Sequence, residues 1–220
     1  MTKESEMILP YPIRFLADEH RMDGQPDDFF IRCNVAYEKY RQLHPDGSYI
    51  HGGDTFDTAR AEVEDIKKQW SYLNVMEEND VFLLGNHEVK MERLQSIAPG
   101  LCLTNIEVNG YLLEHGNRLF KATATVYENT LIAMLLYVHR KTDRRWKWVE
   151  DKIEGLYAGH RSNEVAYEAY EKEGTMKSCF GHSHIKGNYK DWWNPGALWK
   201  DFTILIFDNP QTGPRFEPII

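Results

Sequence analysis

Cysteine is scarce in this sequence, and its spacing excludes two kinds of protein. Only Cys33, Cys102 and Cys179 occur among 220 residues, and no two of them form a CxxC pair. An odd number of widely separated cysteines argues against a disulfide framework, and the absence of a CxxC pair argues against a zinc site built from thiolates. A metal site in this chain is therefore expected to use oxygen and nitrogen ligands.

Long hydrophobic runs are also missing. The longest one covers residues 131–138, whereas a membrane-spanning helix needs about 20 consecutive apolar residues. Residues 1–12 are polar and lack the hydrophobic core of a signal peptide. We therefore expect a cytoplasmic protein without an integral membrane segment.

Positive charge is not in excess. The 26 lysines and arginines are outnumbered by 34 aspartates and glutamates, which gives a formal net charge of -8. This balance argues against a protein that coats nucleic acid through a broad basic face, but it allows a small substrate held by metal ions. Apolar residues make up 42% and charged residues 27%, proportions typical of a folded protein. We expect residues 1–220 to form a single domain.

Short apolar runs alternate with helical patterns in the first half of the chain. Five runs predict buried strands, at residues 13–17, 48–51, 81–84, 111–113 and 178–180. Helices are predicted between the first three runs, over residues 28–43 and 58–73. Because strand–helix–strand units join strands by crossovers, the expected fold class is α/β, with a central sheet covered by helices.

The second half of the chain carries a helical insertion at about residues 117–176. Residues 127–157 predict a long or broken helix, and residues 162–173 predict another one. Beyond the insertion, residues 202–207 form a β-rich run that predicts a further strand. The insertion therefore separates two strands of the predicted fold.

Five polar clusters follow predicted strands, at the points where the strands end. Each contains one or two residues of the types that bind metals: Asp18-Glu19-His20, Gly52-Gly53-Asp54, Gly85-Asn86-His87-Glu88, His115-Gly116 and Gly181-His182-Ser183-His184. In open α/β sheets, the loops at the carboxyl ends of the strands form the ligand crevice. Clusters that are distant in sequence are therefore expected to converge on one site.

The side chains of these clusters form a consistent set of metal ligands. Two aspartates, one asparagine and four histidines supply oxygen and nitrogen, a mixture that suits Mn, Fe, Zn or Ni better than Mg or Ca. Seven ligands exceed the need of one tetrahedral ion. If Asp54 bridges, they complete two sets of four. Two divalent cations about 3.5–4 Å apart are the arrangement that clamps a phosphoryl group and activates water.

In this order, the clusters resemble the motif series of the calcineurin-like metallophosphoesterase superfamily. That series reads DxH, GD, GNH with a following acid, H, and GHxH, and every ligand position is occupied here. The resemblance implies a four-layer α/β/β/α sandwich and two divalent metal ions, with manganese the expected metal. It implies one ion held by Asp18, His20, Asp54 and His184, and a second ion held by Asp54, Asn86, His115 and His182.

The same resemblance implies a metal-dependent phosphoesterase, in which a hydroxide activated between the ions attacks phosphorus. Asp54 would hold both ions at the reacting centre, and His87 would act as the general acid or stabilise the transition state. An imidazole suits this task because its ordinary pKa lies near neutrality. Glu88 would orient His87 or hold the loop, and we favour the loop role. The sequence contains no GxSxG motif that would provide a competing nucleophile.

Several phosphate-ester substrates agree with the sequence. A nucleotide or nucleic-acid phosphodiester is favoured, because a histidine at the position of His87 is typical of phosphodiesterase-like and nuclease-like members. A pyrophosphatase-type hydrolase of a nucleotide-linked or lipid-linked substrate is an alternative, since the helical insertion resembles the UDP-2,3-diacylglucosamine pyrophosphatase branch. A phosphomonoesterase is a further alternative. A noncatalytic binding scaffold on the same fold would have lost metal ligands or the histidine, and this chain retains them.

Polar and basic side chains in the insertion are candidates for substrate contact. They are Asn117, Arg118, Arg144 and Arg145. The competing interpretation is an amphipathic cap whose charges face solvent. Outside the motif series, His51 is expected to pack at the end of its strand rather than to contact the substrate.

Overall fold

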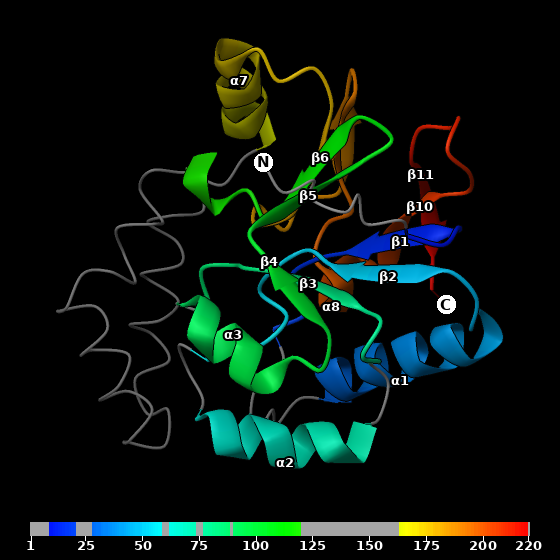
Figure 1. Ribbon diagram of the computed structural model, residues 1–220, viewed down its shortest axis with the longest axis vertical. Helices are drawn as coiled ribbons and strands as arrows, with labels where there is room; N and C mark the ends of the chain where they lie inside the picture. The colour runs from blue at the N-terminus through cyan, green and yellow to red at the C-terminus, as the bar shows by residue number, and fades with distance from the viewer. Residues whose placement is uncertain are drawn as a thin grey trace, which may run out of the picture.

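The computed structural model describes residues 9–20, 28–58, 62–73, 77–88, 90–119 and 163–219. These residues form two β-sheets that lie between helical layers (Figure 1). The predicted helix at residues 127–157 lies outside the described residues, as do Arg144 and Arg145.

The first sheet has six strands in the order β11-β10-β1-β2-β3-β4. Their bounds are β1 (Ile13–Leu16), β2 (Ser48–His51), β3 (Val81–Leu83), β4 (Leu101–Leu103), β10 (Thr203–Phe207) and β11 (Arg215–Pro218). Strands β1 to β4 are parallel, whereas β10 pairs antiparallel with both β1 and β11. Parallel neighbours bring the carboxyl ends of β1, β2 and β3 to one edge of the sheet.

The second sheet has five strands in the order β5-β6-β7-β9-β8. Their bounds are β5 (Asn105–Val108), β6 (Tyr111–Glu114), β7 (Ser178–Phe180), β8 (Gly187–Tyr189) and β9 (Trp192–Asn194). Strands β6, β7 and β9 are parallel, and β5 and β8 pair antiparallel at the two edges. The chain passes directly from β4 at the edge of the first sheet to β5 at the edge of the second.

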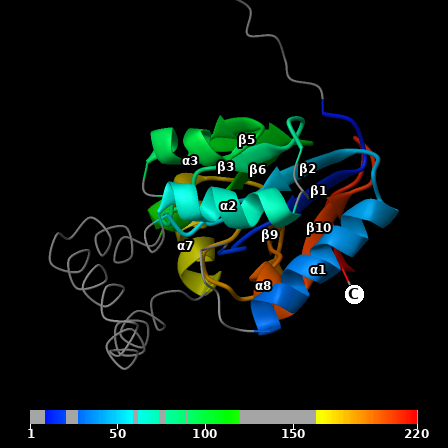
Figure 2. The same cartoon turned by 90° about the horizontal axis from the view of Figure 1, so that it is seen from below.

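Helices cover the outer faces of the two sheets (Figures 1 and 2). The first sheet is covered by α1 (Asp28–Leu43), α2 (Val63–Leu73) and α3 (Met91–Ile97), and the short α8 (Leu198–Asp201) packs into the same core. The second sheet carries the 3-10 turn η1 (Asn117–Leu119) and α7 (Asn163–Glu173). The predicted four-layer α/β/β/α sandwich is confirmed.

Three clusters of buried side chains correspond to the three interfaces between the layers. In β1, Ile13 and Phe15 point into the core between the sheets, whereas Leu16 joins the core beneath the helices. The third cluster joins Tyr170 of α7 to Phe180 of β7 on the outer face of the second sheet. Because both faces of β1 are buried, its sequence is continuously apolar apart from one arginine, as the strand prediction required.

The predicted elements agree with the structure except in one boundary and in several short strands. The strands predicted from residue 13, 48, 81, 111, 178 and 202 and the helices over residues 28–43 and 162–173 are confirmed. The helix predicted from residue 58 is observed as α2 from Val63, because Thr58 belongs to the preceding loop. There its hydroxyl donates to the carbonyl oxygens of His87 and Glu88, both at 3.0 Å.

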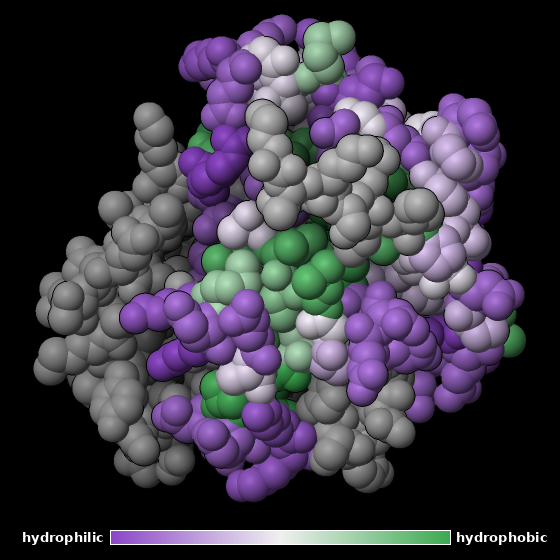
Figure 3. Space-filling model, in the orientation of Figure 1, coloured by the Kyte–Doolittle hydropathy of each residue, from purple (hydrophilic) through white to green (hydrophobic). Residues whose placement is uncertain are grey.

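One face of the molecule has an apolar area over the adjacent edge strands β4 and β5 (Figure 3). Leu101 in β4 is 45% exposed there, while Leu103 and Ile106 pack partly into the core between the sheets. Among the described residues, every helix is too short or too polar to cross a lipid bilayer.

Candidate metal centre

The five polar clusters meet at one edge of the molecule, where the parallel strands of both sheets end. The loop after β1 is joined to the loop after β2 by a hydrogen bond from Asp18 N to Gly53 O at 3.2 Å. The loop after β7 is joined to the loop after β6 by a hydrogen bond from Gly181 N to His115 O at 3.0 Å. A hydrogen bond from His182 N to Oδ2 of Asp18 at 2.9 Å then joins the loops of one sheet to those of the other.

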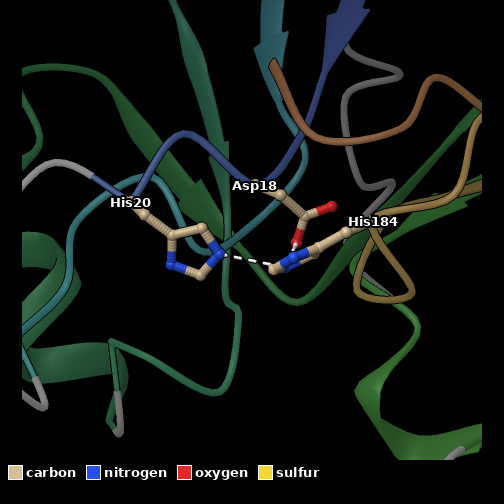
Figure 4. Close-up of side chains that lie close together, drawn as sticks. All are labelled: Asp18, His20 and His184. Carbon is tan, nitrogen blue, oxygen red and sulfur yellow. Dashed lines mark hydrogen bonds and ion pairs between the residues drawn. The ribbon is translucent and has the colours of Figure 1, made fainter. Parts of the chain in front are cut away.

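Asp18, His20 and His184 form the first group of side chains that could hold a cation, and Figure 4 shows them pointing toward one another. Nε2 of His20 lies 3.0 Å from Nε2 of His184. The same atom of His184 lies 3.4 Å from Oδ1 of Asp18. Asp18 and His20 are buried, whereas His184 is half-buried and forms the more open side of the group.

Asp54, His115 and His182 form the second group, and all three are buried. Nε2 of His115 lies 3.2 Å from Oδ2 of Asp54 and 3.1 Å from Nδ1 of His182. It also lies 3.1 Å from Oδ1 of Asn86, which adds an amide oxygen to the group. Nδ1 of His115 lies 3.1 Å from the carbonyl oxygen of Gly52. That contact fixes the ring with Nε2 toward the group, as an outer partner does for metal-bound histidines.

The spacing of these atoms fits bound cations. Ligand atoms about 2.1 Å from a common ion lie about 3.0 Å apart at a right angle and about 3.4 Å apart at the tetrahedral angle. The contacts within the two groups lie between 3.0 and 3.4 Å. Imidazole nitrogens, carboxylate oxygens and an amide oxygen are ligands that first-row transition metals accept. Each group therefore has the geometry and chemistry to hold one divalent ion.

The charges within the second group shift the pKa values of its members in a way that favours exchange of a proton for a metal ion. Burial raises the pKa of Asp54, but the charges of His115 and His87 outweigh burial and hold that pKa well below its usual value. Burial lowers the pKa of His115, but the charge of Asp54 outweighs it and raises the pKa to about 9. A proton on His115 thus balances the buried carboxylate in the metal-free protein, and a bound cation would displace it.

Backbone strain is concentrated in the candidate metal centre. Eight non-glycine residues of the described chain have φ in the left-handed region, and five of them carry predicted metal ligands: Asp18, His20, Asp54, His182 and His184. Such conformations cost of order 1–3 kcal/mol each and persist only where the surrounding structure enforces them. The loops therefore hold strained backbone in order to aim these side chains at one another.

Two glycines of the motif series allow the loops to approach this closely. A Cβ atom at Gly85 would lie 2.2 Å from the backbone nitrogen of Asp54. A Cβ atom at Gly53, which has a φ of +86°, would lie 2.6 Å from Cβ of His115. Any larger residue at either position would displace a candidate ligand.

Glu88 holds the loops together, as the sequence analysis favoured. Its Oε2 accepts hydrogen bonds from the backbone nitrogens of Asp54 (3.1 Å) and Gly85 (2.8 Å), and its Oε1 accepts one from Phe56 (3.0 Å). Burial, followed by the charge of Asp54, raises the pKa of Glu88 to about 7. The carboxyl group thus fixes the GNHE loop against the loop after β2 and does not orient His87.

The imidazole of His87 is oriented by Asp57, a residue that the sequence analysis missed. Nδ1 of His87 lies 2.8 Å from Oδ1 of Asp57, and both side chains are buried. Nε2 of His87 faces Oδ2 of Asp54 at 3.7 Å. With His20, this pair also forms a third set of atoms within reach of a cation. The only signal in the sequence was the position of Asp57 in the same loop as Asp54, three residues further on.

A polar clamp holds the loop over residues 181–184, which carries two candidate ligands. The hydroxyl of Ser183 donates to Oδ1 of Asn163 at 2.6 Å, and Nδ2 of Asn194 donates to that hydroxyl at 2.9 Å. Nδ2 of Asn163 donates to the carbonyl oxygen of Ile185 at 2.9 Å. Asn163 is the first residue of α7. The helix that follows residues 120–162 is therefore anchored directly on the candidate metal centre.

Two of the four predicted substrate contacts fall within the described residues. Asn117 is half-buried and begins η1. The guanidinium of Arg118 donates to both oxygens of Glu114, at 2.7 and 2.8 Å, and to both oxygens of Glu173, at 2.8 Å. These bonds hold α7 to the end of β6. Contact of any of the four residues with a substrate stays a prediction.

The family model of calcineurin-like phosphoesterases matches residues 11–186, a span that contains all five polar clusters. The match over this span supports a metal-dependent phosphoesterase. The chain belongs to the calcineurin-like phosphoesterase family. No curated protein matches the chain significantly in sequence.

Solved structures similar to this chain share little of its sequence. A protein of unknown function from Aquifex aeolicus is 17% identical with a TM-score of 0.44, covering 89% of this chain and 95% of its own. A predicted phosphoesterase from Streptococcus pneumoniae is 14% identical with a TM-score of 0.37, covering 92% and 85%. A cold-active protein-tyrosine phosphatase from a psychrophilic Shewanella is 14% identical with a TM-score of 0.42, covering 90% and 76%.

Proposed function

We propose that this protein is a binuclear phosphodiesterase that hydrolyses a nucleotide or nucleic-acid phosphodiester. One ion would be held by Asp18, His20, Asp54 and His184, and the other by Asp54, Asn86, His115 and His182. Manganese is the expected metal, with iron, zinc and nickel as alternatives, because mixed nitrogen and oxygen ligands without sulfur suit all four. When bound, the two cations supply Lewis acidity toward the phosphoryl oxygens and a hydroxide nucleophile near neutral pH.

The residues around the metal groups orient the general acid, supply a proton to the leaving group and hold the ligand loops in place. Asp57 accepts a hydrogen bond from Nδ1–H of His87, which leaves Nε2 facing the candidate metal ligands. A proton on Nε2 is placed to pass to the leaving oxygen as the bond from phosphorus to that oxygen breaks. Glu88 and the clamp around Ser183 keep the ligand loops from moving during this step.

The pairing of His87 with Asp57 beside the two metal groups is the observation that carries the proposal. A nucleoside alkoxide is a poor leaving group, so a positioned acid lowers the barrier to its departure. A noncatalytic scaffold would not need a buried carboxylate to orient a histidine outside the two proposed ligand sets. The net charge of -8 does not oppose an anionic diester, because bound cations dominate the local field.

A substrate panel with added manganese tests the proposal. It compares kcat/KM for bis-p-nitrophenyl phosphate, p-nitrophenyl phosphate, 2′,3′-cyclic nucleotides, single-stranded DNA and a UDP-sugar lipid. We expect a nucleotide or nucleic-acid diester to be at least tenfold better than the monoester. A His182→Ala variant purified in the same way serves as the control for contaminating phosphatases, and we expect it to be inactive.

Each other outcome of the panel identifies a different function. A monoester turned over at least tenfold faster than every diester would make the protein a phosphomonoesterase. Selective cleavage of the UDP-sugar lipid would make it a pyrophosphatase-type enzyme. If the metal-loaded protein hydrolyses none of the compounds while binding nucleotides, the protein is a binding scaffold.

A further inference from the structure

A buried chain of four charged side chains lies behind the first metal group, and the proposed reaction does not use it. Nδ1 of His51 lies 2.6 Å from Oε1 of Glu19, and Nε2 of His51 lies 3.3 Å from Oδ2 of Asp80. Asp80 accepts two hydrogen bonds from the guanidinium of Arg41, at 2.6 and 2.8 Å. All four residues are at most 8% exposed.

This charged chain runs through the apolar core between the first sheet and α1. The ring of His51 stacks on Phe82 with a centroid distance of 4.4 Å and an angle of 5°, and Tyr37 of α1 meets it edge-on at 6.2 Å. The guanidinium of Arg41 lies over the ring of Tyr49 at 4.2 Å. Buried charges are costly unless they are paired. Alternating signs along this chain satisfy that condition.

Both ring nitrogens of His51 face a carboxylate oxygen. An ionised carboxylate can only accept hydrogen bonds, so the imidazole must donate from both nitrogens and carry a positive charge. Burial alone lowers the pKa of His51, but the charge of Glu19 and the hydrogen bond to Asp80 leave it raised. The contact between Glu19 and His51 is therefore a buried ion pair.

Glu19 connects the other three charged side chains to the metal centre, because it lies between two predicted ligands in the sequence. Its neighbours Asp18 and His20 have φ values of 55° and 49°, and their side chains point toward the first group. The side chain of Glu19 turns into the core and contacts His51, which is fixed in β2 opposite Leu16. A strained loop persists only where its surroundings enforce it, and this ion pair provides an anchor.

We propose that Glu19 and His51 are positioning residues that hold residues 18–20 in the shape in which Asp18 and His20 share one cation with His184. The inference rests on the proposed metal centre. It assigns the effect to the first group, because Asp54 and His115 of the second group have other supports. Glu88 holds Asp54, and the carbonyl oxygen of Gly52 holds His115.

Manganese titration of the full chain, followed by electron paramagnetic resonance and calorimetry, tests the inference. The wild type is expected to bind two equivalents and to give the spectrum of an exchange-coupled pair. Glu19→Gln, which keeps the size of the side chain and removes its charge, is expected to bind one equivalent of Mn²⁺ with normal affinity. The other equivalent should bind at least tenfold more weakly, so that one equivalent gives a six-line spectrum of an isolated ion.

Two reference variants calibrate this measurement. Asp18→Asn alters the first group directly and is expected to give the same isolated-ion spectrum as Glu19→Gln. Glu171→Gln makes the same chemical change at an exposed glutamate of α7 that pairs with Lys190, and it is expected to match the wild type.

A second variant keeps the test decisive if Glu19→Gln does not fold. In Glu19→Leu/His51→Phe, an apolar pair replaces the buried ion pair, a change that folded proteins often tolerate. The same selective loss of one manganese equivalent is expected. Unchanged affinity for both equivalents, an equal loss of both, or failure of both variants to fold would overturn the inference. A wild type that binds fewer than two equivalents would instead refute the metal centre itself.

Discussion

Asp57 and His87 form a buried pair in which Oδ1 of the carboxylate lies 2.8 Å from Nδ1 of the imidazole. A carboxylate at one ring nitrogen fixes the tautomer and the orientation of the ring, and it stabilises the protonated imidazole. The other ring nitrogen faces Asp54 of the second metal group. In the proposed function, this pair delivers a proton to the leaving oxygen of the phosphate ester.

Replacing His87 by alanine is expected to remove general acid catalysis while leaving the metals in place. We expect kcat to fall about 10²-fold to 10³-fold, within the range of such catalysis. The loss should be larger for a nucleoside leaving group than for p-nitrophenolate, which departs without a proton. Steady-state kinetics on both kinds of diester, with metal content measured by elemental analysis, check this prediction. Full activity of the variant would show that the assigned acid is wrong.

Asp57→Asn is expected to act only through His87. The amide cannot stabilise the protonated ring, so we expect kcat to fall at least tenfold. The double variant Asp57→Asn/His87→Ala should be no slower than His87→Ala alone, because groups that work as a unit show non-additive effects. Additive losses in this double-mutant cycle would indicate that Asp57 has a separate role, such as binding a cation with His20.

Metal affinity is expected to increase with pH. The pKa of His115 is raised to about 9 in the metal-free protein, because the charge of Asp54 outweighs burial. A cation must displace this proton, so its apparent affinity should rise about tenfold per pH unit below pH 9 and level off above it. Calorimetry in buffers of different ionisation enthalpy measures the affinity and the proton release together. An affinity that does not change between pH 7 and 8.5 would contradict the exchange.

Asn163→Ala is expected to loosen the loop over residues 181–184. The variant removes the acceptor of the Ser183 hydroxyl hydrogen and the donor to the carbonyl oxygen of Ile185, which costs about 1–3 kcal/mol. Urea denaturation measures this change in the free energy of unfolding. Asn188→Ala, at an exposed position in β8, is the matched control and should change it little. Equal effects of the two substitutions would contradict the clamp.

The sequence predicts most of the central strands, but it misses the edge strands and the internal strand β9, and there is a physical reason for the failure at the edges. Apart from Arg14, residues 13–17 are apolar because both faces of β1 are buried, and such runs stand out in any sequence. The edge strands β4 and β8 have only three residues each, and they expose Leu101 and Tyr189. A strand this short with one open side carries no periodic pattern, so nothing in the sequence distinguishes it from a loop.

The candidate ligands could be predicted because their chemistry lies in the side chains themselves, at the ends of predicted strands. Their supporting partners could not be predicted, since a residue such as Asp57 gains its role only through proximity in the fold. For His51, one feature could be predicted from the sequence and another could not. The expectation that it packs at the end of its strand is confirmed by its stacking on Phe82. Its contact with Glu19 depends on a loop conformation that no local pattern encodes.

Anomalous diffraction from manganese-soaked crystals of the full chain would reveal the binuclear centre itself. We expect two manganese peaks about 3.5–4 Å apart, with Asp54 bound to both. We expect Asp18, His20 and His184 on one ion, and Asn86, His115 and His182 on the other. A single peak with no room for a neighbour, or peaks that leave these side chains uncoordinated, would contradict the binuclear centre.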